Sequence, residues 1–202
     1  SQKSGIPDIP VISVGIYGEQ VGELWEDLIE KRKPLDSVSL PDTISLHTII
    51  YTSGTTGTPK GVMHTASNFM ESSSTLITLF SLPNNLRLFS YLPLAHVAER
   101  LLINAGVVLG ATISFAESLE TFAKELEANQ PHLFFAVPRI WTKFREKILE
   151  SVPQKKLNML LKIPLLNTLI KNKLKKKLGL KEAVFIASAA APIAADMVIW
   201  YK

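Results

Sequence analysis

The sequence of 202 residues contains no cysteine, only four histidines and no long apolar run. Without cysteine, the chain excludes disulfides, thiolate metal sites and cysteine nucleophiles, and four histidines alone disfavour a structural zinc site. No apolar run approaches the roughly 18 residues that a membrane span requires, so we expect no transmembrane helix. Residues 1–20 lack the basic start and the unbroken apolar stretch of a signal peptide, and the sequence therefore gives no sign of export.

Acidic residues are absent between Lys155 and Lys181, a segment that carries nine lysines. The formal net charge of the whole chain is +4, so the remainder of the chain is acidic. The basic pI therefore comes from one segment rather than from a surface for nucleic acid, and we expect no nucleic-acid partner. A mean hydropathy of +0.19 is high for a soluble domain of this size and indicates apolar surface that something outside this chain covers.

Hydrophobic periodicity predicts strands alternating with helices along the chain. This alternation favours an α/β fold with a parallel β-sheet and helices on both faces. We expect 34–43 to be a loop and 47–52 to be a buried strand. The further expected strands are 9–14, 86–91, 112–115, 132–137 and 183–187, and the expected helices are 21–31, 65–80, 101–109, 118–129, 138–149 and 193–202, with a basic segment between them that is split at Pro164.

Residues 51–62, YTSGTTGTPKGV, join the expected strand 47–52 to a run of small hydroxylated residues, glycines and one lysine. Converging backbone N–H groups, hydroxyl donors and a lysine are the groups that hold a phosphate. It is not a Walker loop, because Pro59 and Gly61 stand where that motif requires Gly and Ser or Thr. The alternative is a flexible surface loop. The candidate anion ligands are Ser53, Gly54, Thr55, Thr56, Gly57, Thr58 and Lys60.

This segment resembles the phosphate-loop signature of the adenylate-forming superfamily, the AMP-binding enzymes that include acyl-CoA synthetases, luciferases and peptide-synthetase adenylation domains. In that family the loop binds the β- and γ-phosphates of ATP. The resemblance implies that Thr52 contacts Mg²⁺ and that Lys60 takes part in catalysis. It also implies a phosphate-binding role for Ser53, Gly54, Thr55, Thr56, Gly57 and Lys60.

A second motif, SYLPLAHVAER at 90–100, follows the expected strand 86–91. Taken alone, His96 could be a hydrogen-bonded structural residue, and Glu99 with Arg100 an ordinary surface pair. The motif is similar to the Pro-Leu-x-His segment of adenylate-forming enzymes, and its Ala-Glu-Arg extension looks like the long-chain acyl-CoA synthetase branch. The resemblance makes His96 the candidate for orienting the acyl adenylate. Segments 115–121 and 134–141 also resemble that branch, although we expect their apolar residues to be core rather than substrate tunnel.

A third motif, IASAAAPI at 186–193, places small side chains at the end of an expected strand. Small residues there either leave room for a flat ring or allow tight strand-to-helix packing. The motif resembles the family's Ser-Gly-(Gly/Ala)-Ala-Pro segment beside adenine, with Ala189 in place of the usual Gly. The added Cβ could narrow the adenine slot or alter the backbone angles. By resemblance the candidate adenine contacts are Ala190, Ala191 and Pro192.

The resemblance implies a long-chain fatty acid–CoA ligase that uses ATP, Mg²⁺ and coenzyme A. Because the family's later motifs are missing, we expect a piece of the large N-terminal domain, with a strand, helix and linker in 1–44 and a partial AMP-binding subdomain in 45–202. We expect this chain alone to be inactive and the remainder of the parent chain to be its partner. The alternatives are a non-catalytic nucleotide-binding module and a ligase for a different acid.

The basic segment 155–181 allows two further interpretations. Its second half places Leu166, Leu169, Ile170, Leu174 and Leu178 on one helical stripe opposite the lysines. The stripe either packs on its own domain, which we favour, or docks on an anionic membrane as a basic amphipathic helix. We expect a cytoplasmic protein, peripheral at the membrane if the second interpretation holds.

Overall fold

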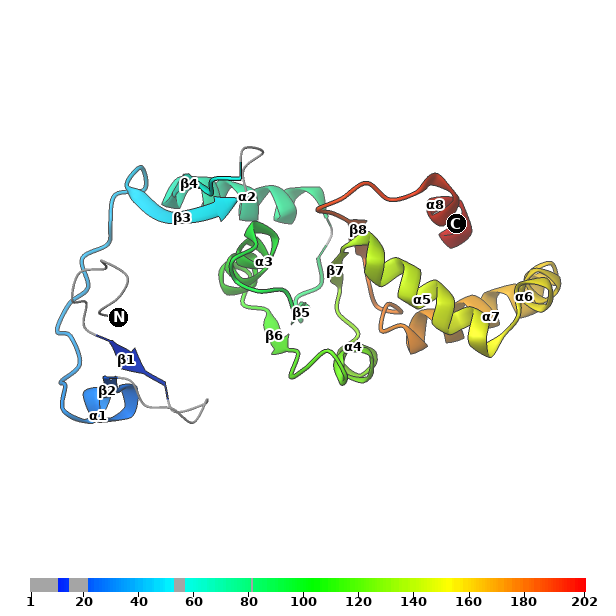
Figure 1. The fold of residues 1–202 in the computed structure, drawn as a ribbon, viewed down its shortest axis with the longest axis horizontal. Helices are drawn as coiled ribbons and strands as arrows, with labels where there is room; N and C mark the ends of the chain where they lie inside the picture. The colour runs from blue at the N-terminus through cyan, green and yellow to red at the C-terminus, as the bar shows by residue number, and fades with distance from the viewer. Residues whose placement is uncertain (1–10, 15–21, 53–56, 81) are drawn as a thin grey trace. The chain divides into compact units, whose positions relative to one another are not determined.

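The computed structural model describes residues 11–14, 22–52, 57–80 and 82–202. Its contacts divide the chain into two compact units, Ser1–Pro41 and Asp42–Lys202 (Figure 1). In the first unit, β1 (Ile12–Ser13) pairs in parallel with β2 (Glu23–Leu24), and α1 (Trp25–Glu30) follows at once. No residue of α1 is buried. Over the described residues, the first unit therefore has little core of its own.

The second unit alternates strands with helices, and this confirms the α/β prediction. Among the described residues, no helix is long and apolar enough to cross a bilayer. The strands are β3 (Leu46–Thr52), β4 (Lys60–Thr65), β5 (Arg87–Ser90), β6 (Thr112–Phe115), β7 (Leu133–Ala136) and β8 (Phe185–Ser188). The helices are α2 (Ala66–Leu79), α3 (Val97–Val108), α4 (Phe122–Asn129), α5 (Pro138–Ser151), α6 (Gln154–Leu161), α7 (Pro164–Lys177) and α8 (Ala195–Tyr201).

The central strands pair in parallel, as the alternation of strands and helices predicts. Strand β5 pairs with β6, and β7 pairs with β8. At the start of β7, the His132 N–H donates to the Arg87 carbonyl at 2.9 Å, so β7 lies beside β5. The Arg87 N–H in turn donates to His132 Nδ1 at 2.9 Å. The order β6, β5, β7, β8 brings the ends of β5, β7 and β8 to one edge.

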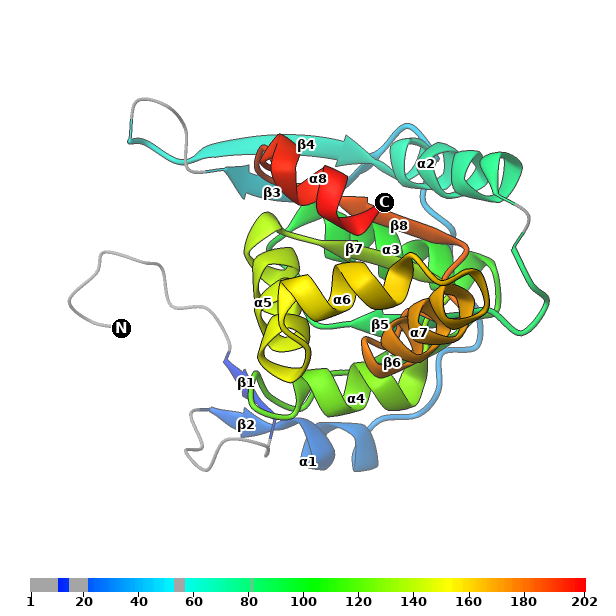
Figure 2. The ribbon, with the colours of Figure 1, turned by 90° about the vertical axis from the view of Figure 1, so that its right-hand side faces the viewer.

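Helices cover both faces of this group of strands (Figure 2), and the buried apolar side chains come from β5 and β7. Successive side chains of a strand point to opposite faces, so Phe89 and Leu88 enter different cores. Phe89 and Phe134 pack with residues of α4, α5 and α8 on one face. Leu88 packs with Leu102 of α3 on the other. Strands β5 and β7 are thus buried on both sides, whereas no residue of the outer strands β6 and β8 is fully buried.

The β3–β4 pair departs from the prediction in two ways. The structure forms a strand β4 within a region expected as loop and helix start, and it pairs antiparallel with β3. The expectation that 47–52 is buried was wrong, because only Ile50 of β3 is buried and Tyr51 is 68% exposed. The hairpin touches the rest of the unit on one side, where the rings of His47 and His64 meet Phe69 of α2 edge-on.

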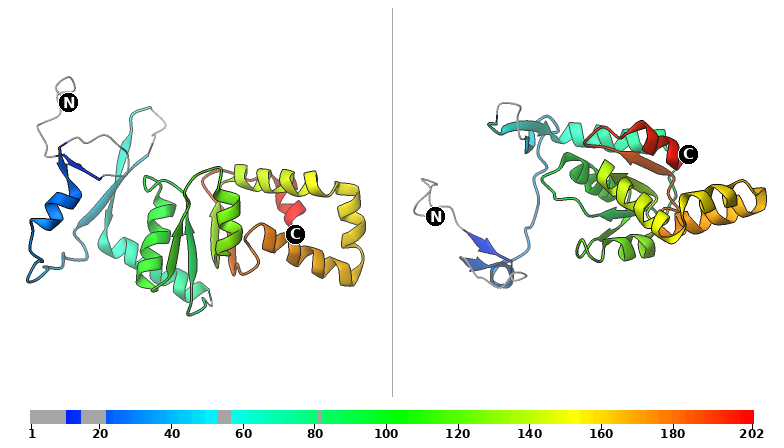
Figure 3. Two further views of the ribbon diagram at one scale, coloured as in Figure 1. Left: turned by 90° about the horizontal axis from the view of Figure 1, so that it is seen from below. Right: turned by 45° about the vertical axis from the view of Figure 1, so that its right-hand side comes forward.

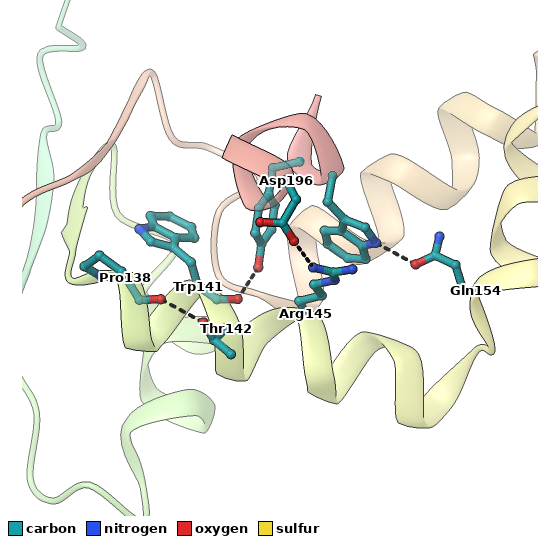
Figure 4. Close-up of polar contacts among 8 residues, drawn as sticks. Pro138, Trp141, Thr142, Arg145, Gln154 and Asp196 are labelled. Carbon is teal, nitrogen blue, oxygen red and sulfur yellow. Dashed lines mark hydrogen bonds and ion pairs between the residues drawn. The ribbon is translucent and has the colours of Figure 1, made fainter. Parts of the chain in front are cut away.

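Helix α8 is fixed against α5 and the start of α6. This docking matters for the site, because α8 follows directly on the small-residue segment after β8. Three polar contacts hold α8 in place. Two of them come from the half-buried phenol of Tyr201 and the indole N–H of Trp200. These contacts join Tyr201 Oη to Trp141 O at 2.6 Å, Trp200 Nε1 to Gln154 Oε1 at 2.7 Å, and Arg145 Nη1 to Asp196 Oδ2 at 3.3 Å (Figure 4).

The basic segment forms α6 and α7, and the expected break at Pro164 is confirmed. The helix α7 leads to Gly179, whose φ of 74° is the left-handed conformation typical of a helix end. The expected packing of its apolar stripe holds only in part. Ile170, Leu174 and Leu178 are half-buried, whereas Leu166 is 38% and Leu169 is 65% exposed.

Candidate functional site

The β3–β4 hairpin presents the two ends of the phosphate-loop motif side by side. Thr52 pairs with Lys60 in the antiparallel register, and the Thr52 hydroxyl donates to the Lys60 carbonyl at 3.4 Å. Both residues are exposed. A lysine ammonium at the open end of such a stem is free to approach an anion. Four of the predicted phosphate ligands, Ser53, Gly54, Thr55 and Thr56, lie outside the described residues.

Gly57 has a backbone conformation that favours glycine. Its φ is +79°, and a Cβ added there would meet nothing within 4 Å. The requirement for glycine is therefore conformational, since there is space for a side chain. A left-handed residue near the end of the loop lets it turn back into β4.

Thr52 is the one predicted metal ligand, and the fit of Mg²⁺ depends on what surrounds it. Mg²⁺ in nucleotide sites usually keeps several waters and binds one or two protein oxygens together with substrate phosphates. The part of the chain that is described contains no group of three or more His, Asp or Glu residues that could hold a metal. The Thr52 hydroxyl would therefore fit as one ligand to an ion whose other ligands are phosphate oxygens and water.

His96 stands at the N-cap of α3, at the end of a tight turn after β5. Its backbone N–H donates to the Pro93 carbonyl at 2.9 Å, and its own carbonyl accepts from the N–H of Glu99 at 3.2 Å. The imidazole makes no capping hydrogen bond and is exposed. The backbone therefore fixes the residue, while the ring stays available for a ligand.

Glu99 and Arg100 form hydrogen bonds with the backbone of this turn rather than a surface pair with each other. Glu99 is 2% exposed, and its Oε2 accepts from the Leu92 N–H at 3.2 Å. Arg100 Nε donates to the Leu94 carbonyl at 2.6 Å, and its Nη1 donates to Thr48 Oγ1 at 2.7 Å. The sequence did carry a signal for Glu99, because it is the third residue after the N-cap, where a carboxylate often reaches back toward the preceding turn.

Two buried polar atoms near this turn have no hydrogen-bond partner in the described structure, Glu99 Oε1 and Ser188 Oγ. Buried polar atoms are nearly always paired, so each unpaired one requires an explanation such as a bound molecule. Ser188 ends β8 within the small-residue motif 186–193 and pairs with Ala136 in β7. Two of the sequence motifs therefore each place one unpaired polar atom near the ends of the strands.

An apolar cavity of about 210 Å³ joins the His96 motif to the small-residue motif. Its walls come from the turn after β5, the start of α3, the end of β7 and the residues after β8. Phe135 and Val137 line it, so segment 134–141 contributes both to the core and to the cavity. The full lining is Leu92, His96, Val97, Ala98, Phe135, Ala136, Val137, Ala189 and Ala190.

The strain in the small-residue motif lies at Ala190, one residue after the expected position. Ala190 has a φ of 69°, a left-handed conformation that costs an L-residue about 1–2 kcal/mol. Ala189 is not among the residues with positive φ, and its N–H continues the strand by donating to the Ala136 carbonyl at 3.1 Å. Ala191 and Pro192 are exposed and lie between β8 and α8, outside the cavity lining.

Tyr91 lies under the turn, and its phenol is a hydrogen-bond donor. Its hydroxyl donates to the Phe135 carbonyl at 2.8 Å. Burial first, and the Glu99 carboxylate second, raise the pKa of the Tyr91 phenol well above its ordinary value. The phenol therefore stays neutral in the physiological range and fixes β7 to the turn, without acting as a base.

A family model described as AMP-binding enzyme matches residues 5–202. The chain belongs to this family. It is 37% identical over 116 residues to fatty acyl-CoA synthetase B of Dictyostelium discoideum, a match that covers 57% of this chain and 17% of that protein. It is 32% identical over 184 residues to the peroxisomal long chain acyl-CoA synthetase 6 of Arabidopsis thaliana, covering 80% of this chain and 25% of that protein.

Solved structures show the same fold. The adenylation domain of a carboxylate reductase from Mycobacterium chelonae superposes with a TM-score of 0.66 at 22% identity, over 88% of this chain and 28% of that one. At this identity the likeness concerns the fold alone. The chain spans a quarter or less of the length of the two curated relatives named above.

Proposed function

We propose that this chain forms part of the ATP- and acyl-binding site of a long-chain fatty acid–CoA ligase. The family match and the names of the two relatives support this activity for the whole protein. Such a ligase joins the fatty acid carboxylate to the α-phosphate of ATP, releasing pyrophosphate and forming acyl-AMP. The thiol of coenzyme A then attacks the acyl carbon and releases AMP. Since the chain covers so little of its relatives, we expect the 202 residues alone to be inactive.

The observation that carries the proposal is the cavity bordered by both His96 and Ala189–Ala190. His96 belongs to the motif assigned to the acyl group, and the alanines belong to the motif assigned to adenine. Acyl and adenosyl parts are the two halves of one acyl adenylate. A cavity that touches both motifs is therefore suited to hold the joint between them. In our proposal the His96 ring orients this joint, and the cavity walls exclude water from it.

In this proposal the β3–β4 hairpin binds the phosphate end of ATP. Lys60 and the loop Ser53–Gly57 bind the β- and γ-phosphates, and Thr52 contributes one oxygen to Mg²⁺. Mg²⁺ held there would supply positive charge to the departing pyrophosphate. The fatty acid carboxylate is already ionised near neutral pH, so the attack on phosphorus requires no general base. Residues that bind and orient thus suffice for the adenylation step on this side of the site. Beyond the cavity, we propose Ala191 and Pro192 as further adenine contacts.

Pyrophosphate exchange in the full-length protein tests these roles. Lys60→Ala should raise the KM for ATP, and His96→Ala should lower palmitate-dependent exchange while leaving ATP binding almost unchanged. Lys124→Ala on α4, where the lysine is exposed, is a matched control that removes the same charge elsewhere. Exchange rates in both variants that equal the control would remove Lys60 and His96 from the mechanism.

We also propose that the α6–α7 region contacts anionic membrane. The observation in its favour is the exposure of apolar side chains among the lysines, with Leu165 83%, Leu169 65% and Met159 60% exposed. Exposed apolar residues beside clustered lysines are the pattern of an interfacial helix. Liposome co-sedimentation should show binding that needs anionic lipid and falls when Leu165 and Leu169 are changed to Ser. Equal binding to neutral vesicles in high salt would contradict this proposal.

A further inference from the structure

A second apolar cavity lies away from the candidate site, within the helical part of the unit. Helices α5, α6 and α7 follow one another around three sides of a U (Figure 3). The cavity among them measures about 310 Å³. Its walls include Leu157 of α6, which is 3% exposed, and the half-buried Ile170 and Leu174 of α7. None of its lining residues borders the cavity at His96.

The size and chemistry of this cavity suit one alkyl chain. An apolar cavity of about 150 Å³ stays dry and takes up benzene, so one of twice that size has room for a longer hydrocarbon. It is also at the lower end of the range of small-molecule sites, about 300–1,000 Å³. Because polar groups contribute little to its lining, water in the cavity would find few partners.

Three lysines rim this cavity, and no acidic residue is among its lining residues. Lys147 comes from α5, and Lys173 and Lys177 come from α7, so cations approach from two walls. Lys173 and Lys177 belong to segment 155–181, which has no acidic residue, whereas Lys147 on α5 has Glu146 and Glu150 as sequence neighbours. None of the three lysines forms an ion pair within the described structure. The lining of the cavity therefore carries net positive charge around an apolar interior.

We propose that this cavity binds a single-chain amphiphile with an anionic head group. The alkyl chain lies against Leu157, Ile170 and Leu174, and the head group sits among the ammonium groups of Lys147, Lys173 and Lys177. A free fatty acid and a single-chain phospholipid share this chemistry. The site is separate from the proposed acyl-adenylate site, and the proposal does not depend on the ligase activity.

Photolabelling of the full-length protein tests the proposal by location. A dodecanoate that carries a diazirine should label peptides from 147–178, and peptide mapping separates this label from any at 92–98 or 189–190. Changing Lys147, Lys173 and Lys177 together to Gln should reduce labelling of 147–178 about tenfold, because three partly solvated charges each contribute modestly. Ile170→Trp, which fills the cavity, should reduce it at least as much.

A matched control removes the same number of lysine charges from the neighbouring α6 region. Lys155, Lys156 and Lys162 changed to Gln lie outside the cavity lining and should leave the labelling within about twofold. Competition by dodecanoate or dodecyl phosphate supports the proposal, and the stronger competitor identifies the head group. Equal competition by dodecyltrimethylammonium, labelling unchanged by both cavity variants, or a loss in the control as large as in the rim variant overturns it. Labelling confined to 92–98 or 189–190 would overturn this proposal while supporting the proposed function.

Discussion

Removing the Glu99 side chain should loosen the turn that carries His96. In Glu99→Ala, the Leu92 N–H loses the acceptor that lies 3.2 Å away. An unpaired, partly buried N–H costs about 1–3 kcal/mol, and losing a carboxylate from the first turn of α3 costs about 0.3–1 kcal/mol. Glu99 Oε1 is buried and has no partner in the described structure. Removing it relieves the cost of its desolvation, which offsets part of this loss of stability. The net effect on the turn should be about 2 kcal/mol.

Glu99→Gln is the matched comparison, because an amide oxygen can still accept from Leu92. It should change the stability of the turn by less than about 1 kcal/mol. Hydrogen exchange of the full-length protein measures the difference locally. Protection of amides in 92–98 should fall about thirtyfold in Glu99→Ala and only a fewfold in Glu99→Gln. Equal losses in the two variants, or unchanged protection in both, would refute the role assigned to the Leu92 hydrogen bond.

Three other predictions concern stability. Ala190→Gly should stabilise the protein by roughly 0.5–1 kcal/mol in urea unfolding, since relief of the left-handed strain exceeds the added entropy of the unfolded chain; a loss of stability would contradict the strain. Burial, and then Arg87, lower the pKa of His132, so its contribution is present above about pH 6.5 and lost as pH falls; unfolding curves should show this slope in the native protein and not in His132→Leu. Leu157→Ala should cost about 2–5 kcal/mol and Leu169→Ala less than about 0.5 kcal/mol, and equal costs would contradict the different burial of the two leucines.

The sequence predicted the central strands and their helices because burial on two faces leaves a plain signal. Strand β7 is a short apolar run, and Gly110 and Gly179 adopt the left-handed conformation expected of helix ends. Strand β4 was missed because Gly61 and His64 weaken its β pattern. A Cβ at Gly61 would lie 2.8 Å from Ile49 Cγ2, so the glycine is required by the cross-strand neighbour rather than by a turn.

The sequence predicted the motifs of the candidate site but not how they come together in one cavity. His96 and Ala190 are distant in the sequence, and only the pairing of β7 with β8 and the position of β5 bring them to one cavity. The surface-pair alternative for Glu99 and Arg100 does not hold, because Glu99 is 2% exposed. Its place three residues after the N-cap signals a contact with the preceding turn, but the depth of its burial depends on the tertiary packing of that turn.

The most direct test of the central claim is the affinity of the full-length protein for an acyl-adenylate analogue with a sulfamate in place of the phosphate. Ala189→Leu adds bulk inside the cavity beside His96, and Val107→Leu, at a position that is 72% exposed on α3, is the control. Calorimetry should show affinity reduced on the order of ten- to a hundredfold in Ala189→Leu and unchanged in the control. Native affinity in a correctly folded Ala189→Leu protein would contradict the claim that this cavity holds the acyl adenylate.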